Sequence, residues 1–79
     1  MWNRYTRPCE GDKLNRDDWF IIRTEEAADG RVTLVLVDFA AGANADATRC
    51  EMADVEAKEM AEETAAELLS EGWSLAEAR

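Results

Sequence analysis

The run from Arg31 to Ala40 constrains the fold of this chain more than any other segment. Successive side chains of a β-strand point to opposite faces of a sheet, and in this run both alternating sets are largely apolar. A strand with two apolar faces is typical of the interior of a sheet. The sequence therefore predicts a central strand with these two sets on opposite faces: Val32, Leu34 and Leu36, and Thr33, Val35, Val37 and Phe39.

Two further strands are predicted around this central one. The aromatic and β-branched residues of Trp19 to Thr24 indicate a strand, and Glu25 to Gly30, which ends in Asp-Gly, indicates the turn that follows it. Ala41 to Ala45 contains Gly and Asn and is predicted to be a loop. The alternation of Thr, Cys and Met with Arg and Glu over residues 48–52 then indicates a third, half-exposed strand.

A long helix is predicted from Asp54 to Glu71. Asp54 is a residue type that caps helix N-termini, and Gly72 can adopt the left-handed conformation that ends many helices. After the helix, Trp73 and Leu75 are expected to fold back on the sheet, and Ser74 with Glu77 has the spacing of a capping box for one last helical turn. The side of the helix that must pack on the sheet carries Ala57, Met60, Ala61, Thr64, Ala65 and Leu68.

These elements predict a single α+β domain over residues 1–79, because a chain of this length has room for only one core. The expected architecture is an antiparallel three-stranded sheet with one long acidic helix packed on one face. Met1 to Asp18 is predicted to be a loop, in which residues 1–6 either pair at a sheet edge or cover the opposite face. Contiguous apolar patches rarely stay exposed, so a second copy of the protein is an alternative cover for that face.

The charge of the chain is concentrated in its second half. Residues 38–79 hold eleven carboxylates and three basic side chains, whereas residues 1–37 carry a net charge of −1. The predicted helix contains seven of these acids and a single basic side chain, Lys58. Like charges four residues apart weaken a helix by about 0.2–0.5 kcal/mol per pair. A sequence optimised for folding alone would place lysines among them, and a solubilising face usually mixes both signs.

The acidic side chains of the helix are therefore the candidate binding site for a partner. Four of them recur at spacings of three, four and four residues and fall on one stripe of the helix. With a net charge of −9, the chain is expected to avoid direct binding to nucleic acid and anionic membranes and to favour a basic protein surface. The alternative is that the stripe is only a solvated face. The candidate residues are Asp54, Glu56, Glu59, Glu62, Glu63 and Glu67.

The residue types that catalysis and metal binding require are scarce. The chain has no histidine, which removes the commonest general base and the commonest metal ligand. Cys9 and Cys50 lack the spacing of a zinc site, and neither Ser70 nor Ser74 lies in a nucleophile motif. Carboxylates along one straight helix cannot converge on a single ion without a second element. We therefore expect a protein that is not an enzyme and has no catalytic residues, metal site or cofactor.

The sequence also bears on the compartment. The apolar run Val32 to Val37 is far shorter than the roughly 20 residues that span a bilayer, and the N-terminus has no apolar signal region. Cys9 and Cys50 can form one bridge at most, and free thiols are the expected state. A cytoplasmic location is the resulting expectation.

The chain as a whole resembles the small acidic anti-CRISPR proteins that phages encode. The resemblance rests on the start MWNRYTRPCEGD, the strands WFIIRT and RVTLVLVDF, and the helix DVEAKEMAEETAAELLSEGW. It implies an inhibitor of a type I CRISPR surveillance complex, type I-C in particular, acting in the host bacterial cytoplasm. Some members of that family occupy a basic channel as mimics of DNA, without catalysis. These proteins share no common sequence pattern, so the resemblance assigns no residue roles.

A second function remains open from the sequence. A small structural or regulatory module, working as a homodimer or an adaptor, would use the apolar sheet face that the helix leaves uncovered. In that case the acidic helix would only keep the protein soluble.

Overall fold

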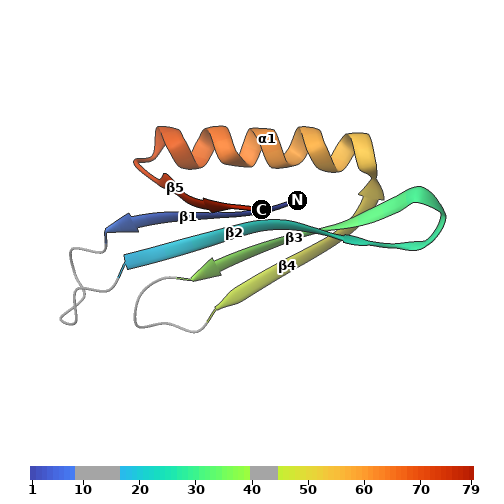
Figure 1. The fold of residues 1–79 in the computed structure, drawn as a ribbon, viewed down its shortest axis with the longest axis horizontal. Coiled ribbons are helices and arrows are strands. Elements are labelled where there is room, and N and C mark those ends of the chain that lie inside the picture. Colours follow the sequence, from blue (N-terminus) through green and yellow to red (C-terminus); the bar gives the residue numbers. More distant parts are fainter. Residues whose placement is uncertain (9–16, 40–44) are drawn as a thin grey trace.

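The computed structural model describes residues 1–8, 17–39 and 45–79 of the chain. The strands of this part of the chain form one antiparallel sheet, in the order β4-β3-β2-β1-β5. The helix α1 lies over one face of the sheet (Figure 1). A short 3-10 turn, η1 (Ala28–Gly30), joins the second and third strands. The bounds in chain order are β1 (Trp2–Pro8), β2 (Asp17–Glu26), β3 (Arg31–Phe39), β4 (Asp46–Ala53), α1 (Asp54–Ser70) and β5 (Ser74–Ala78).

The predicted α+β class, with one antiparallel sheet and one helix, is confirmed, but the predicted number of strands is wrong. The sheet has five strands and not three. The predicted strands correspond to β2, β3 and β4, and β3 lies between the other two as expected. Residues 2–6 of the segment that was expected at an edge or over the opposite face belong to β1, which lies inside the sheet between β2 and β5. Cys9 and residues 41–44 of the predicted loop lie outside the described residues.

The C-terminal segment was expected to form a helical turn and is instead β5. Its residues pair with β1, with Asn3 opposite Ala78 and Thr6 opposite Ser74. The backbone N–H of Trp2 donates to the carbonyl of Arg79 at 3.3 Å, and the N–H of Arg79 donates back at 2.8 Å. This ladder satisfies the backbone groups of β5, so pairing with a distant strand overrides the local capping signal.

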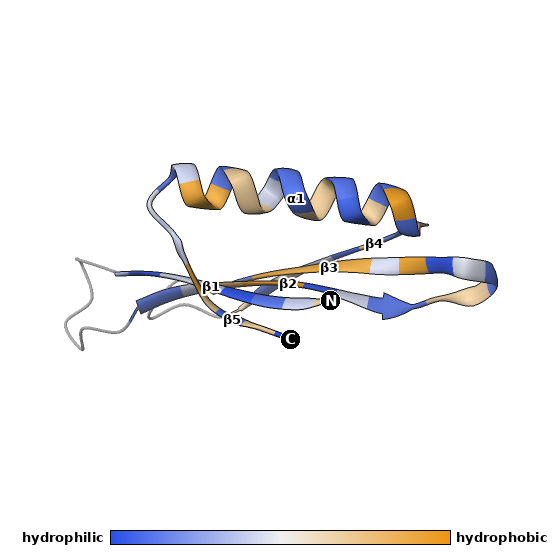
Figure 2. Cartoon of the chain, turned by 45° about the horizontal axis from the view of Figure 1, so that its top comes forward, coloured by the Kyte–Doolittle hydropathy of each residue, from blue (hydrophilic) through white to orange (hydrophobic). Residues whose placement is uncertain are grey.

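The register of the strands decides which face of the sheet the helix covers. Directly opposite residues of antiparallel strands point to the same face, and Leu34 pairs with Cys50 and Thr24. Val32, Leu34 and Leu36 share one face, as the alternation predicted. The structure places α1 over that face: Leu34 belongs to the core cluster, and Val32 and Leu36 pack against it. The opposite set, which includes Val35 and Val37, faces away from the helix. Figure 2 shows the apolar stretches of β2 and β3 beneath α1, whose ribbon alternates between hydrophilic and hydrophobic residues.

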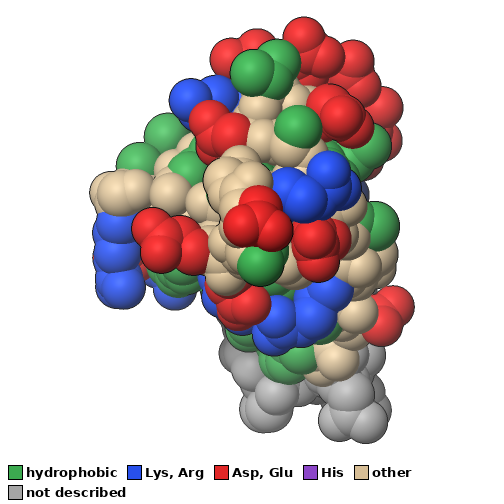
Figure 3. All heavy atoms as spheres, turned by 90° about the vertical axis from the view of Figure 1, so that its right-hand side faces the viewer, with side chains coloured by type: hydrophobic (Ala, Val, Ile, Leu, Met, Phe, Trp, Pro, Cys, Tyr) green, Lys and Arg blue, Asp and Glu red, His purple; other side chains and the backbone are tan. Residues whose placement is uncertain are grey.

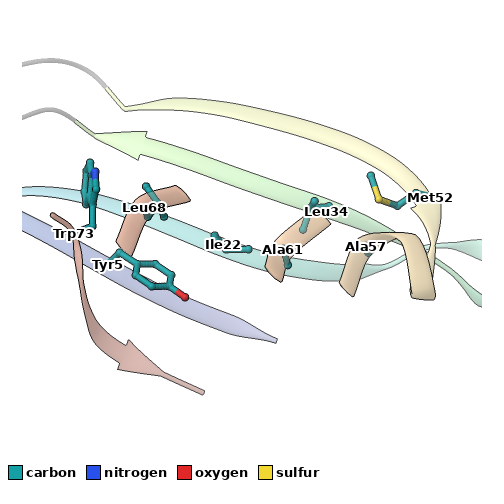
Figure 4. Packing of buried hydrophobic residues seen from close by; sticks show 8 residues of the cluster. All are labelled: Tyr5, Ile22, Leu34, Met52, Ala57, Ala61, Leu68 and Trp73. Atoms are coloured by element: carbon teal, nitrogen blue, oxygen red, sulfur yellow. The ribbon is translucent and has the colours of Figure 1, made fainter. Parts of the chain in front are cut away.

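The core lies between the helix and the sheet (Figure 4). Ala57 is fully buried, so its small side chain brings the first half of α1 close to the strands. Met60 was expected to face the sheet but is 45 % exposed. It lies about 80° around the helix from Leu68, at the border of the buried sector. The buried members of the cluster are Tyr5, Ile22, Leu34, Met52, Ala57, Ala61, Leu68 and Trp73.

The start of α1 differs from the prediction. Asp54 was expected to be the N-cap, but Ala53 occupies that position and no side chain caps the helix. The reason is that β4 continues to Ala53, which pairs with Arg31, so the strand leads directly into the helix. Asp54 is instead the first helical residue, where its charge still favours the positive end of the helix dipole.

The end of α1 agrees with the prediction from Gly72. The helix ends at Ser70, and Gly72 has a φ of 93°. The N–H of Trp73 donates to the carbonyl of Leu68 at 3.0 Å, and the N–H of Gly72 donates to that of Leu69 at 3.3 Å. These two bonds form a Schellman motif. In this motif the two residues of the longer-range bond, here Leu68 and Trp73, usually also make an apolar contact. Here Leu68 and Trp73 are both core residues, so the cap also turns the chain toward β5.

Replacing Gly72 with alanine is expected to destabilise the protein by about 1–2 kcal/mol, because a Cβ is strained at this positive φ. No atom lies within 4 Å of the added Cβ, so a steric clash contributes nothing to the loss. Urea denaturation measures the change. Gly72→Asn is the matched control and should lose less, because asparagine tolerates the left-handed region better. Equal losses for both variants would contradict the conformational explanation.

Within the described part of the chain, α1 is too short and too polar to cross a membrane.

Candidate functional site

The sheet fixes which side of α1 reaches solvent. Ala57, Ala61 and Leu68 are buried against the strands. All six candidate carboxylates are exposed, as the sequence analysis required of a binding surface. We call them the acidic helix surface: Asp54, Glu56, Glu59, Glu62, Glu63 and Glu67.

Four of these six side chains share one side of the helix. At 100° per residue, Glu56, Glu59, Glu63 and Glu67 fall within a sector of about 80°. They extend over about 16 Å of helix, since each residue rises 1.5 Å. These four residues are the acidic stripe, which the spacing in the sequence predicted.

The other two carboxylates lie away from the stripe. Glu62 is on the flank toward β1, where it lines a hollow of about 130 Å³ with Met1 and Asn3. Asp54 lies at the start of the helix, and its carboxylate pairs with Lys58 at 3.0 Å. The structure therefore brings together four candidate residues and places two at separate positions.

The carboxylates of the helix differ from those of the sheet in their partners. Among the described residues, no helix glutamate forms an ion pair, and Lys58 pairs only with Asp54. α1 consequently carries a net charge of −5 from six acids and one lysine. On the sheet, by contrast, Glu25, Glu51 and Glu77 each form an ion pair with an arginine. Five carboxylates without an ion pair thus lie together on α1. The other described acids without one are spread over several strands and turns: Asp17, Glu26, Asp29, Asp38, Asp46 and Glu71.

Figure 3 views the molecule from the end at which α1 begins. Acidic side chains gather at the top, over the helix, whereas basic and acidic side chains are mixed over the sheet below. This separation of charge within a small domain is the main electrostatic feature of the described surface.

The sheet face turned away from the helix carries a charged bridge that the sequence analysis did not predict. Glu25 of β2 accepts hydrogen bonds from Arg23 and from Arg49 of β4, the latter at 2.8 Å. Because β3 lies between β2 and β4, the bond from Arg49 crosses over that strand. It covers Val35, which has both Arg23 and Arg49 as cross-strand neighbours and is fully buried. Only the strand register brings these residues together, so composition and spacing could not reveal the bridge.

The bridge makes stability depend on pH through Glu25. The hydrogen bond from Arg23 lowers the pKa of Glu25 below 4.5, and Arg49 adds to the effect, whereas burial opposes it. A carboxyl with a lowered pKa in the folded state contributes stability that is complete above its unfolded pKa. That contribution is lost as the pH falls through the folded pKa.

Glu25→Gln is therefore expected to lower the melting temperature at pH 7 and to leave it almost unchanged at pH 2–3, relative to the parent protein. Circular dichroism melts across this range measure the difference. Glu26→Gln, on an adjacent exposed residue, is the control and should shift neither value. A loss that is the same at both pH values would show that Glu25 acts by packing and not by its charge.

Aromatic side chains also hold arginines at two places. The guanidinium of Arg7 lies 4.5 Å from the ring centre of Trp73, and that of Arg79 lies 4.4 Å from the ring centre of Trp2. Arg7 additionally pairs with the buried Asp18 at 3.1 Å. These contacts with Trp73 and Asp18 give Arg7 a structural role in the fold.

The described residues were expected to hold no metal site, and the possible metal ligands among them are scattered. Within residues 1–8, 17–39 and 45–79, no three Cys, Asp or Glu side chains are grouped closely enough to hold a metal ion. A shallow hollow of about 470 Å³ lies between the β2–β3 turn and the start of α1, lined in part by Glu26, Arg31 and Asp54. The acidic helix surface remains the strongest candidate site.

Comparisons with known proteins give no relative for this chain. No protein family, no curated protein and no solved structure matches it. Function must therefore be argued from the site alone.

Proposed function

We propose that this protein is a non-catalytic inhibitor that binds a basic, nucleic-acid-binding protein surface through its acidic helix and thereby excludes the nucleic acid. The observation that carries the proposal is the charge of α1: its carboxylates are exposed, and only Asp54 has a cationic partner among the described residues. A lysine- or arginine-lined groove would supply the missing partners.

The charge density of the helix supports a limited kind of mimicry. A net charge of −5 over 17 residues corresponds to about one charge per 5 Å of helix. One strand of DNA carries one charge per 3.4 Å, and the duplex one per 1.7 Å. The helix therefore resembles a single phosphate backbone more closely than a duplex. We infer that it occupies a groove that tracks one strand.

The resemblance to anti-CRISPR proteins supplies the specific target of the proposal, a type I CRISPR surveillance complex and type I-C first among them. The test is a pull-down of the tagged protein with the purified complex at low and high salt, with a labelled target duplex as competitor. Binding that weakens with salt and displaces the duplex supports the proposal. Binding that leaves the duplex in place would exclude competition as the mechanism, and absence of binding would exclude this target.

The second candidate function uses the sheet face away from the helix. Trp19 and Phe39 stack there with ring centres 4.7 Å apart, and both are partly exposed. Aromatic side chains of this kind often anchor protein partners. Val37→Glu tests it, because Val37 is only half-buried, whereas the neighbouring Val35 is fully buried and its substitution would unfold the protein. This second function would be favoured if Val37→Glu abolished binding to a partner while replacement of Glu59 and Glu63 with lysine left that binding intact.

A further inference from the structure

We propose that β4 is an interface between two copies of this chain, whose β4 strands pair antiparallel about a two-fold axis at Cys50. This inference does not depend on the proposed function. It rests on the position of β4, on the direction of its backbone groups and on the order of its charges.

β4 forms one edge of the sheet (Figure 1). In the part of the chain that the structure describes, no strand lies beyond it, and residues 46–51 are all exposed. An edge strand of eight residues presents backbone N–H and C=O groups that another strand can bind.

Two hydrogen bonds of the sheet determine which residues of β4 offer those groups. The N–H of Thr24 donates to Met1, so Thr24 faces β1, and the N–H of Ala27 donates to Arg31, so Ala27 faces β3. The hydrogen-bonding direction alternates along each strand, and the β2–β3 and β3–β4 registers contain no shift. Even-numbered residues of β4 therefore bond to β3. The outward groups belong to Ala47, Arg49, Glu51 and Ala53.

The charges of β4 select one register for pairing with a second copy. The outward groups belong to odd-numbered residues, so each odd-numbered residue must pair with an odd-numbered residue of the second copy. The two-fold axis then passes through a residue and not between two residues. An axis at Arg49 would place two arginines opposite each other, and an axis at Glu51 would place two glutamates there. An axis at Cys50 places Arg49 opposite Glu51 of the second copy, twice. Directly opposite Cβ atoms are about 4.5–5.5 Å apart, so this order of charges favours the register at Cys50.

The available side chains are compatible with this pairing. Arg49 is 54 % exposed and Glu51 is 57 % exposed, although each has a partner in its own chain, Glu25 and Arg31 respectively. A guanidinium has five donors, so Arg49 can hold Glu25 and a second carboxylate together. The uncharged Cys50 side chains would meet at the axis, on the face that carries α1.

The net charge of −9 on each copy opposes this association. Salt at about 0.15 M reduces the range of that repulsion to about 8 Å, whereas backbone hydrogen bonds are insensitive to it. We therefore expect dimers to form more readily at 0.15–0.5 M salt than at 0.01 M. The same increase in salt weakens the binding in the proposed function, so the two activities can be separated.

The decisive experiment uses two singly substituted proteins and sedimentation across a concentration series in 0.3 M salt with a reductant. At the outward positions of β4, Arg49→Glu leaves two acids and Glu51→Arg leaves two arginines. Each variant alone is expected to dimerise at least about tenfold more weakly than the parent. An equimolar mixture is expected to recover the dimer, because the acidic edge of one variant would then lie opposite the basic edge of the other.

The control is Arg4→Glu, which changes the net charge as Arg49→Glu does and lies on the same sheet face, but in β1. It should dimerise like the parent. A parent that stays monomeric throughout the series would overturn the proposal. So would a mixture that stays monomeric, or an Arg49→Glu variant that dimerises like the parent.

Amide hydrogen exchange followed by NMR tests the same proposal without a substitution. The amides of Thr48 and Cys50 bond to β3 and should be protected at every concentration. Those of Arg49 and Glu51 should become at least about tenfold better protected as the dimer forms. A dimer in which these two amides remain unprotected would show that association uses another surface.

Discussion

Replacing Glu59 and Glu63 together with lysine is expected to abolish binding to the basic partner surface, with an affinity loss of at least about 100-fold. Both residues belong to the acidic stripe and are exposed without ion pairs among the described residues. Each substitution removes a charged contact worth about 1.5–3 kcal/mol and places a like charge against the partner. Titration of the labelled protein against the surveillance complex, at low salt, measures the loss.

The fold should survive this double substitution. The two lysines repel each other, but they form attractive pairs with Glu56 and Glu67, so helix stability is expected to be unchanged or slightly higher. A thermal melt checks this point. A variant that unfolds, or that binds like the parent, would remove the support for the acidic stripe.

A charge-matched control distinguishes the stripe from the overall charge. Glu26→Lys combined with Asp46→Lys also changes the net charge from −9 to −5 and alters exposed residues outside α1. This control should keep most of the affinity of the parent. An equal loss in the control would show that long-range attraction by the whole chain, and not contact with the helix, drives the association.

Leu34→Ala is expected to lower the free energy of unfolding by about 2–5 kcal/mol. Leu34 is 2 % exposed and belongs to the cluster beneath α1. The substitution would leave a cavity there, and small neighbours such as Ala57 and Ala61 cannot fill it. A domain of this length has roughly 4–12 kcal/mol of stability in total, so the substitution removes a large fraction of it. Urea denaturation followed by circular dichroism measures the change.

Leu75→Ala is the matched control, because the same side-chain atoms are removed at a position that is 52 % exposed. Its cost should be below about 1 kcal/mol. A similar loss for both leucines would contradict the location of the core between α1 and the sheet.

The sequence pattern was sufficient where side-chain periodicity determines structure. Both apolar faces of β3 follow from its alternation, and the stripe of Glu56, Glu59, Glu63 and Glu67 follows from the helical period. Gly72 marked the end of α1 because few other residues adopt its conformation readily.

The pattern was insufficient where a segment depends on distant partners. β1 alternates polar and apolar residues only weakly, and β5 has five residues, so neither has a strong strand signal alone. β5 becomes a strand by pairing with β1, and β1 by pairing with both β2 and β5. The bridge from Arg49 to Glu25 is similarly invisible, since it requires the register of three strands. Met60 was misplaced because it lies at the border of the helix face that the sheet covers.

The pairing of β1 with β5 also determines the order in which the protein can fold. The β2–β3 and β3–β4 contacts join neighbouring segments, whereas Thr6 meets Ser74 across almost the whole chain. Contacts between such distant segments form late, because closing a long loop costs more entropy. During synthesis on the ribosome, the edge of β1 that does not pair with β2 must therefore stay open until residues 74–78 have been made, and its exposure to other nascent chains ends only then.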